Sequence, residues 1–146
     1  MSSELDNWLE AQEFQVLLDE NGQIIDYLNN EKRRENKPEE RIRQKTTYIL
    51  HEEYCYPKNQ IEHECNIKIG RENKRADIVV FTSKEAKANR DQGRIHIIGE
   101  TKPPTEKNPD GQLKSYISST SAQGGFWTNG NRIVFYRKNS TTGEII

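Results

Sequence analysis

The sequence predicts a single α/β (α+β) domain in which helices flank a mixed central β-sheet. Short apolar runs rich in β-branched residues, such as 78–81 and 95–98, are typical of buried strands. Segments 38–53 and 112–119 instead space their apolar residues as a helix does. In chain order we expect a hairpin, a helix, three strands, a helix and two strands. Such an order favours helices packed against a sheet.

Length and composition limit the possible classes. The chain has 146 residues, of which 32% are hydrophobic and 31% charged, and its net charge is -1. A chain of this length can bury a core without disulfides. The charge gives no overall attraction for nucleic acid, so any basic surface has to arise from local clustering.

The two cysteines and the absence of long apolar runs indicate in which cellular compartment the protein is found. Cys55 and Cys65 lack metal-ligand spacing and predict reduced thiols, with a single disulfide as the alternative. No apolar run approaches the about 20 residues of a membrane span, and no signal peptide opens the chain. We therefore expect a cytoplasmic protein with no membrane partner.

Residues 1–37 are predicted to form an N-terminal extension with a β-hairpin. Asn21-Gly22 separates two β-type runs, 14–18 and 23–28, which is a strong hairpin signal. Residues 29–37 are a charged connector, for which a solvated loop is expected. Its Lys32, Arg33 and Arg34 could nevertheless contact a phosphate backbone.

The main domain, 38–146, is predicted to open with a helix from Pro38 to about residue 53. Proline suits the first turn of a helix, and Glu39 and Glu40 complement its dipole there. Glu39 lies three residues before Ile42 and shares its apolar face. A core-facing glutamate needs a cationic partner, so Glu39, or failing that Glu40, is a candidate for a metal site. The alternative is an acid in solvent at the start of the helix.

The remaining elements follow from periodicity and turn residues. Residues 60–69 alternate as a half-buried strand does, and 75–82 and 94–101 read as two central strands. The loop 83–93 between them contains one possible helical turn. Pro103-Pro104 ends the last of these strands, and a helix over 112–119 follows. A second hairpin, 124–137, turns on Asn129-Gly130.

Three charges interrupt the two central strands: Asp77, Glu100 and Lys102. Glu100 and Lys102 are two residues apart and project from the same face, and Asp77 meets them if the strands are neighbours. Two carboxylates beside an ammonium indicate a divalent-metal site. The alternative is a capping Asp77 and a weak Glu100–Lys102 ion pair on an edge strand. The apolar density of both runs favours central strands, where buried charges need a purpose.

The predicted ligands are hard oxygens, which Mg²⁺ prefers, with Mn²⁺ able to substitute. We expect Asp77, Glu100 and the backbone carbonyl of Thr101 to hold the metal, and Glu39 to support a second metal or a metal-bound water. Lys102 can orient the attacking water or help deprotonate it. The three histidines have no zinc-site spacing, and no Ser/His/Asp order, P-loop or GxGxxG is present.

The order of these motifs resembles a known nuclease group. Asp77 followed by Glu100-Thr101-Lys102, with an acidic residue on an upstream helix, resembles the PD-(D/E)xK nuclease superfamily. With segments 38–44, 112–116 and 128–130, the chain is similar to the N-terminal nuclease domain of type I restriction enzyme R subunits, from about 38 to 137. Similar domains are fused to adenine methyltransferases. Ala76 before Asp77, where the superfamily name has proline, and Gly99, where a bulkier residue is usual, depart from the pattern.

The resemblance implies a restriction-endonuclease-like fold and a Mg²⁺-dependent endodeoxyribonuclease in a type I-like restriction-modification system. Gln112 and Tyr116 would face the scissile phosphate, and Gln112 and Lys114 would bind nucleic acid; for Tyr116 the alternative is a core aromatic. The implied partners are DNA and further domains or subunits, such as a helicase/translocase, a methyltransferase or a specificity subunit. The chain would then be a fragment or a stand-alone copy of a larger protein.

Two other functions stay open. One is a catalytically inactive nucleic-acid-binding or assembly module, and the other is a nuclease-fold domain acting on RNA or on a non-DNA partner. Binding would require basic groups gathered on one side. The candidates are Lys32, Arg33, Arg34, Lys87, Arg90, Lys102, Lys107 and Lys114. Intact Asp77, Glu100 and Lys102 favour the nuclease, because a binding module does not need all three.

Overall fold

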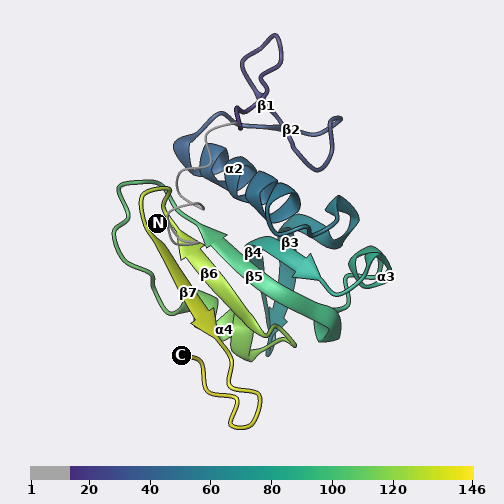
Figure 1. Cartoon of the computed structure of the whole chain (residues 1–146), viewed down its shortest axis with the longest axis vertical. Coiled ribbons are helices and arrows are strands. Elements are labelled where there is room, and N and C mark those ends of the chain that lie inside the picture. The colour runs from purple at the N-terminus through teal and green to yellow at the C-terminus, as the bar shows by residue number, and fades with distance from the viewer. Residues whose placement is uncertain (1–13) are drawn as a thin grey trace.

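The computed structural model describes residues 14–146 and confirms the α+β fold (Figure 1). Its main sheet has the order β3 (Ile61–Ile69), β4 (Glu72–Phe81), β5 (Ile95–Thr101), β6 (Gly124–Thr128) and β7 (Ile133–Arg137). All neighbours are antiparallel except β5 and β6, which are parallel. The helices of the described chain are α2 (Pro38–Glu52), α3 (Lys84–Ala88) and α4 (Gln112–Ser118). These bounds match the predicted helices and strands to within a few residues.

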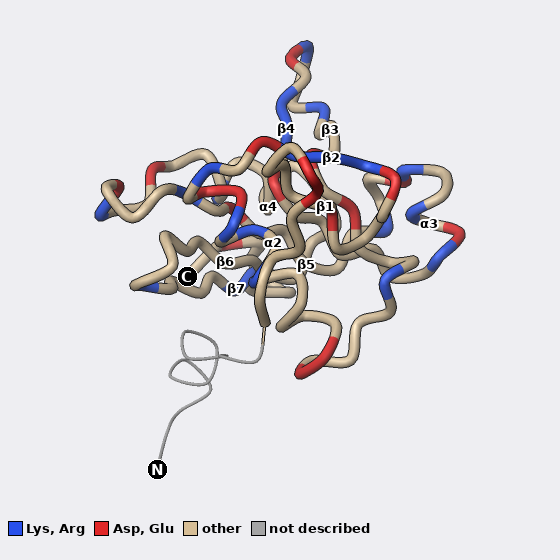
Figure 2. The backbone as a smooth tube through the Cα atoms, turned by 90° about the horizontal axis from the view of Figure 1, so that it is seen from above, with Lys and Arg blue, Asp and Glu red and all other residues tan. Residues whose placement is uncertain are grey.

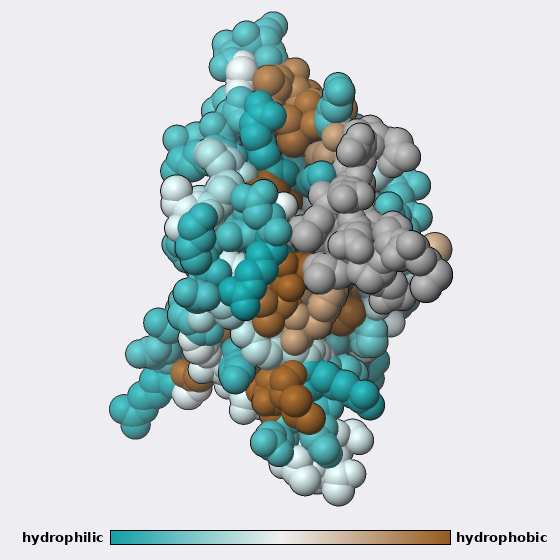
Figure 3. Space-filling model, turned by 60° about the vertical axis from the view of Figure 1, so that its left-hand side comes forward, coloured by the Kyte–Doolittle hydropathy of each residue, from teal (hydrophilic) through white to brown (hydrophobic). Residues whose placement is uncertain are grey.

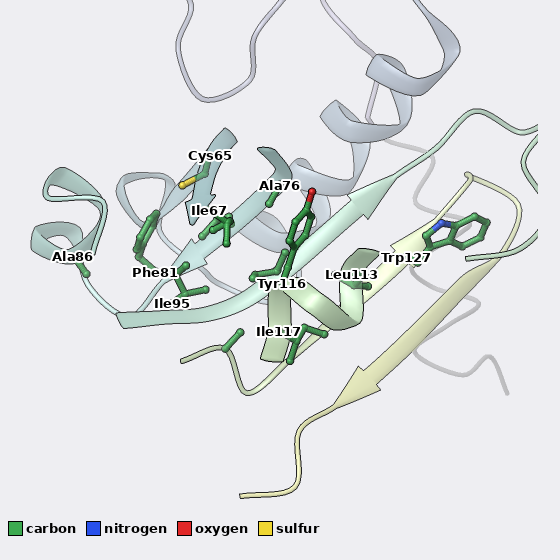
Figure 4. Close-up of a cluster of buried hydrophobic side chains, with 13 residues drawn as sticks. Cys65, Ile67, Ala76, Phe81, Ala86, Ile95, Leu113, Tyr116, Ile117 and Trp127 are labelled. Carbon is green, nitrogen blue, oxygen red and sulfur yellow. The ribbon is translucent and has the colours of Figure 1, made fainter. Parts of the chain in front are cut away.

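Helices α2 and α4 pack on opposite faces of the sheet. Consecutive side chains of β4 alternate between the two faces. Val79 and Phe81 belong to the cluster that α4 completes, whereas Ile78 and Val80 belong to the cluster that α2 completes. Figure 4 shows the α4 cluster, to which the helix contributes three fully buried side chains: Leu113, Tyr116 and Ile117. Helix α4 also supplies the crossover that the parallel pair β5–β6 requires.

Packing explains why glycine stands at position 99 on β5, where the resembled nuclease pattern has a bulkier residue. A Cβ atom at this position would lie 2.1 Å from Cζ of Phe126 on the neighbouring strand β6. Real Cβ contacts are never that short, so the ring of Phe126 takes the space that a bulkier residue would fill. The glycine next to Glu100 is therefore explained by packing between β5 and β6.

The extension differs from its predicted hairpin. The turn at 19–22 is present, but β1 (Ile24–Ile25) pairs with β2 (Arg33–Arg34). The predicted partner run, 14–18, makes a single bridge, between Leu18 and Ile24. The connector is thus not a simple solvated loop, because Arg34 is largely buried and forms ion pairs. The first 13 residues of the extension lie outside the described residues.

A buried polar network holds the extension on the domain. Asp26 on the chain after β1 is 4% exposed, accepts a hydrogen bond from Arg34 Nε at 2.9 Å and lies 2.9 Å from Nδ1 of His63 on β3. His63 Nε2 lies 2.6 Å from Oγ1 of Thr47 on α2. Gln44 Nε2, also on α2, donates to Asp26 at 3.3 Å. Because each group has a partner, the network joins the extension, α2 and β3 without leaving these polar atoms unsatisfied.

The described residues on the face seen in Figure 3 are mostly hydrophilic, with separate apolar patches. Large hydrophobic side chains are exposed at Leu17, Leu18, Phe135 and Ile146. No helix in the described part of the chain is long and apolar enough to cross a bilayer. Cys55 is exposed and Cys65 is buried, and both are free thiols, so the alternative of a disulfide between them is excluded.

Candidate active site

Strands β4 and β5 bring Asp77 and Glu100 together. The register pairs Ile78 with Gly99, so the two acidic residues lie on adjacent strands at the same level. The backbone N–H of Thr101 donates to Oδ2 of Asp77 at 2.9 Å. In return, the backbone N–H of Asp77 donates to Oε1 of Glu100 at 3.4 Å. These reciprocal hydrogen bonds fix both carboxyl groups where the strands pair.

The environment of Glu100 opposes its negative charge. The side chain is buried, with 4% of the residue exposed. Burial, together with the carboxylate of Asp77, raises the pKa of Glu100 to about 9. Two carboxyl groups this close cannot both ionise at low cost without a cation nearby. The pair therefore forms a site that a cation would stabilise.

Lys102 supplies one positive charge close to the pair. Burial alone would lower the pKa of its ammonium, but Glu100 and Asp77 raise it above the ordinary value. Lys102 is therefore protonated at neutral pH. An ammonium in this state can orient a water or stabilise negative charge, but it is a poor proton acceptor.

The orientation of α2 distinguishes Glu39 from Glu40. The pKa of Glu39 is raised by partial burial and by Asp77 and lowered by Lys102, which places this carboxyl in the field of the site. Glu40 instead accepts hydrogen bonds from Arg43 Nε at 2.8 Å and Gln44 Nε2 at 3.0 Å. Glu39 is thus close enough to Asp77 and Lys102 to be affected by their charges, whereas Glu40 is hydrogen-bonded within its own helix.

Helix α4 does not bring all of its predicted residues to the pair. Tyr116 is fully buried, and its hydroxyl donates to the backbone oxygen of Arg75 at 3.2 Å (Figure 4). Burial, Glu100 and Asp77 raise its pKa to about 12. It occupies the place of a core aromatic and anchors β4 two residues before Asp77. Gln112 is half-buried at the start of α4, and Lys114 Nζ lies 5.5 Å from the ring centre of Tyr136 on β7.

A group of arginines and glutamates next to the pair was not predicted. Glu64 on β3 lies between His63 and Cys65, which pair with Ile78 and Ala76 of β4, and it has a φ of +53°, in the left-handed region. Its carboxylate pairs with Arg34 at 3.0 Å, Arg43 at 3.4 Å and Arg75 at 3.8 Å. Non-glycine residues with strained backbones often lie near functional sites. The alternating pattern of β3 gives no sign of this conformation, because the pattern reports only burial.

A cavity of about 370 Å³ opens beside Asp77. The strands contribute Glu64, Asp77 and Thr101 to its lining, and α2 contributes Glu39, Glu40 and Arg43. Arg33 and Arg34 of β2 complete one wall. The extension therefore borders the candidate site directly.

The residues present fit a divalent metal. In the described chain no three His, Cys, Asp or Glu side chains form a metal-binding group, so the site offers two carboxylates rather than three. Within residues 14–146, Oγ1 of Thr101, the residue after Glu100, is buried without a hydrogen-bond partner. Carboxylate and hydroxyl oxygens are hard donors that suit Mg²⁺. A cation at this position would neutralise the repulsion that raises the pKa of Glu100.

The family comparison agrees with the motif order. The model of the family described as type I restriction enzyme R protein N terminus (HSDR_N) matches residues 38–146, about three quarters of the chain. The chain belongs to this family. No curated protein and no solved structure gives a significant match to this chain.

The match to the type I restriction enzyme R protein N-terminus family includes all the predicted site residues. The match begins at the first residue of α2 and includes Glu39, Asp77, Glu100 and Lys102. It leaves out residues 14–37, including β1 and β2. The basic wall that β2 places beside Asp77 therefore lies outside the matched residues.

Proposed function

We propose that this chain is a Mg²⁺-dependent endodeoxyribonuclease domain of the PD-(D/E)xK type in a type I-like restriction system. The observation that carries the proposal is the convergence of Asp77 and Glu100 on adjacent strands, where reciprocal backbone hydrogen bonds hold both carboxyl groups. Lys102 is close enough for both carboxylates to raise the pKa of its ammonium. A binding module would have no reason to bury Glu100 against a second carboxylate, because that arrangement costs stability unless a cation is bound. Family membership supports the restriction-system part of the proposal.

The chain's residues have distinct roles in this proposal. Asp77, Glu100 and an oxygen of Thr101 would hold the metal, which would activate a water and offset charge on the phosphate. Lys102, as an ammonium, orients that water and stabilises charge on the phosphate oxygens. Glu39 accepts hydrogen bonds from waters around the site. In the reaction water adds to phosphorus and one P–O bond breaks, leaving a phosphate end and a hydroxyl end.

Gln112 and Tyr116 have supporting roles. Tyr116 holds the backbone of β4 through Arg75 and so positions Asp77. Gln112, at the half-buried start of α4, is the proposed donor to the substrate backbone. DNA specificity and ATP-driven movement would come from other domains or subunits of the restriction system.

The proposal is tested by nicking of supercoiled plasmid in Mg²⁺. We expect Asp77→Asn and Glu100→Gln each to reduce the rate at least about 100-fold, because each removes a metal ligand. Asparagine at position 77 keeps an oxygen that can accept from Thr101, so the fold is retained. Glu85→Gln, an exposed acid on α3, is the matched control and should cut as the wild type does. Nicking by Asp77→Asn at the wild-type rate would refute the proposal.

A further inference from the structure

A second cavity, of about 550 Å³, lies between the extension and the β3–β4 part of the core. Separate parts of the chain contribute basic side chains to its lining: Lys32 just before β2, Arg75 on β4, Lys87 on α3 and Arg90 in the turn after α3. With Arg34 there are five cationic side chains, against the acidic Asp26, Glu62 and Glu64. The net charge of the chain is -1, so this surplus of positive charge is local. Figure 2 shows the basic residues of β2 lying beside β3 and β4, with those of α3 nearby.

This basic cavity adjoins the cavity at Asp77. Arg34 and Glu64 line both of them, and Arg34 Nη1 lies 3.0 Å from Glu64 Oε2. The ion pair thus forms the border between the two hollows. An extended polymer bound at Asp77 could therefore cross this ion pair and continue into the basic cavity.

The two lysines of the basic cavity are available to an anion. The ion pairs formed within residues 14–146 involve neither Lys32 nor Lys87, and Nζ of Lys87 donates a hydrogen bond to the backbone oxygen of Lys58 at 3.3 Å. Arg90 pairs with Glu62 at 3.0 Å, and Arg75 with Glu64 at 3.8 Å. Both arginine side chains are about two thirds exposed. A phosphate in the cavity can therefore approach the exposed sides of both guanidinium groups while their ion pairs with Glu62 and Glu64 stay in place.

We propose that the basic cavity binds a backbone phosphate of DNA on one side of the scissile bond, with Lys32 and Lys87 as phosphate contacts. This inference rests on the proposed nuclease function, because the scissile phosphate at Asp77 defines where the neighbouring phosphates lie. The DNA backbone carries regularly spaced negative charges, and these bind best where Lys and Arg side chains neutralise them. The extension then belongs to the substrate-binding surface, although it lies outside the family match.

The test measures binding of a short fluorescein-labelled DNA duplex by anisotropy, in EDTA, at a series of KCl concentrations. Lys32→Ala and Lys87→Ala should each reduce the slope of log Kobs against log salt by about 1, because each removes one phosphate contact. Arg137→Ala removes the charge of an exposed residue on β7, at the opposite edge of the sheet, and should leave the slope unchanged. The side chain of Lys32 is exposed and its hydrogen bonds are made by its backbone, so the variant should fold.

The outcomes separate this inference from the nuclease proposal. Slopes for Lys32→Ala and Lys87→Ala that equal the wild-type slope, or no measurable DNA binding by the wild type, would overturn the phosphate site. Because the assay contains no metal, it reads binding whether or not the chain cuts DNA. Loss of the nuclease proposal would instead appear as plasmid nicking that does not depend on Asp77.

Discussion

Single residues explain most of the chemistry at the Asp77–Glu100 pair. Sequence reasoning found Asp77, Glu100 and Lys102 because charges are conspicuous within apolar strands. It could not decide between Glu39 and Glu40, because that choice depends on how α2 is rotated against the sheet. It also could not place Tyr116, whose hydroxyl partner, Arg75, lies 41 residues away in the sequence. The residue types were predictable, but their contacts depend on tertiary packing.

The two thiols give a prediction at this scale. Burial, with a smaller effect from Glu62, raises the pKa of Cys65 to about 11, whereas Cys55 is exposed. At pH 8 a thiol-disulfide reagent should therefore modify one thiol of the folded chain quickly and the second only after unfolding, because the thiolate is the reactive form. Reaction of Cys65 should accelerate as the pH approaches 11. Cys55→Ser, with one remaining thiol, identifies the slow group; rapid labelling of that variant at pH 8 would contradict the assignment.

At the scale of elements, periodicity predicted the helices and the five strands of the main sheet because each has a clear apolar pattern. Strand β2 was missed, since its two residues are both arginines and carry no apolar signal. Its pairing with β1 depends on Asp26, which becomes buried only when the extension meets α2 and β3. A charge run reads as solvent-exposed unless its distant partners are known.

The Asp26 network predicts a large loss of stability on Asp26→Asn. The substitution leaves Arg34 and His63 without their buried carboxylate, and breaking a buried ion pair costs about 3–5 kcal/mol. Denaturant unfolding at pH 7 measures the difference. Glu35→Gln, which removes an exposed partner of Lys37, is the control and should cost less than about 1 kcal/mol. Equal stability of the two variants would contradict the role given to the network.

The carboxylate of Asp26 also makes the stability difference between the wild type and Asp26→Asn depend on pH. Burial on its own would raise the pKa of Asp26, but the hydrogen bonds from His63 and Arg34 hold it well below its usual value of 3.8. The carboxylate of Asp26 therefore takes up a proton less readily in the folded state than in the unfolded state. The stabilisation is present above about pH 4 and is lost as the pH falls through the folded pKa. The gap between the wild type and Asp26→Asn should therefore narrow below about pH 4.

At the scale of the whole molecule, the fold and the restriction-enzyme family were both predictable, because the motifs lie in a fixed order along most of the chain. What the sequence did not reveal is how the extension relates to the site. Arg33 and Arg34 border the cavity at Asp77, and Lys32 lines the adjoining basic cavity. These positions follow from the docking of 14–37 against α2 and β3, which no local pattern encodes.

The account depends most on whether Asp77 and Glu100 hold a metal. Isothermal calorimetry of Mg²⁺ binding to the wild type and to Asp77→Asn tests this directly, without requiring DNA cleavage. We expect one class of site in the wild type and loss of that heat in Asp77→Asn, which should still unfold cooperatively as a folded protein does. Binding of Mg²⁺ to Asp77→Asn with wild-type affinity, or no binding to either chain even with DNA added, would contradict a metal site at this pair.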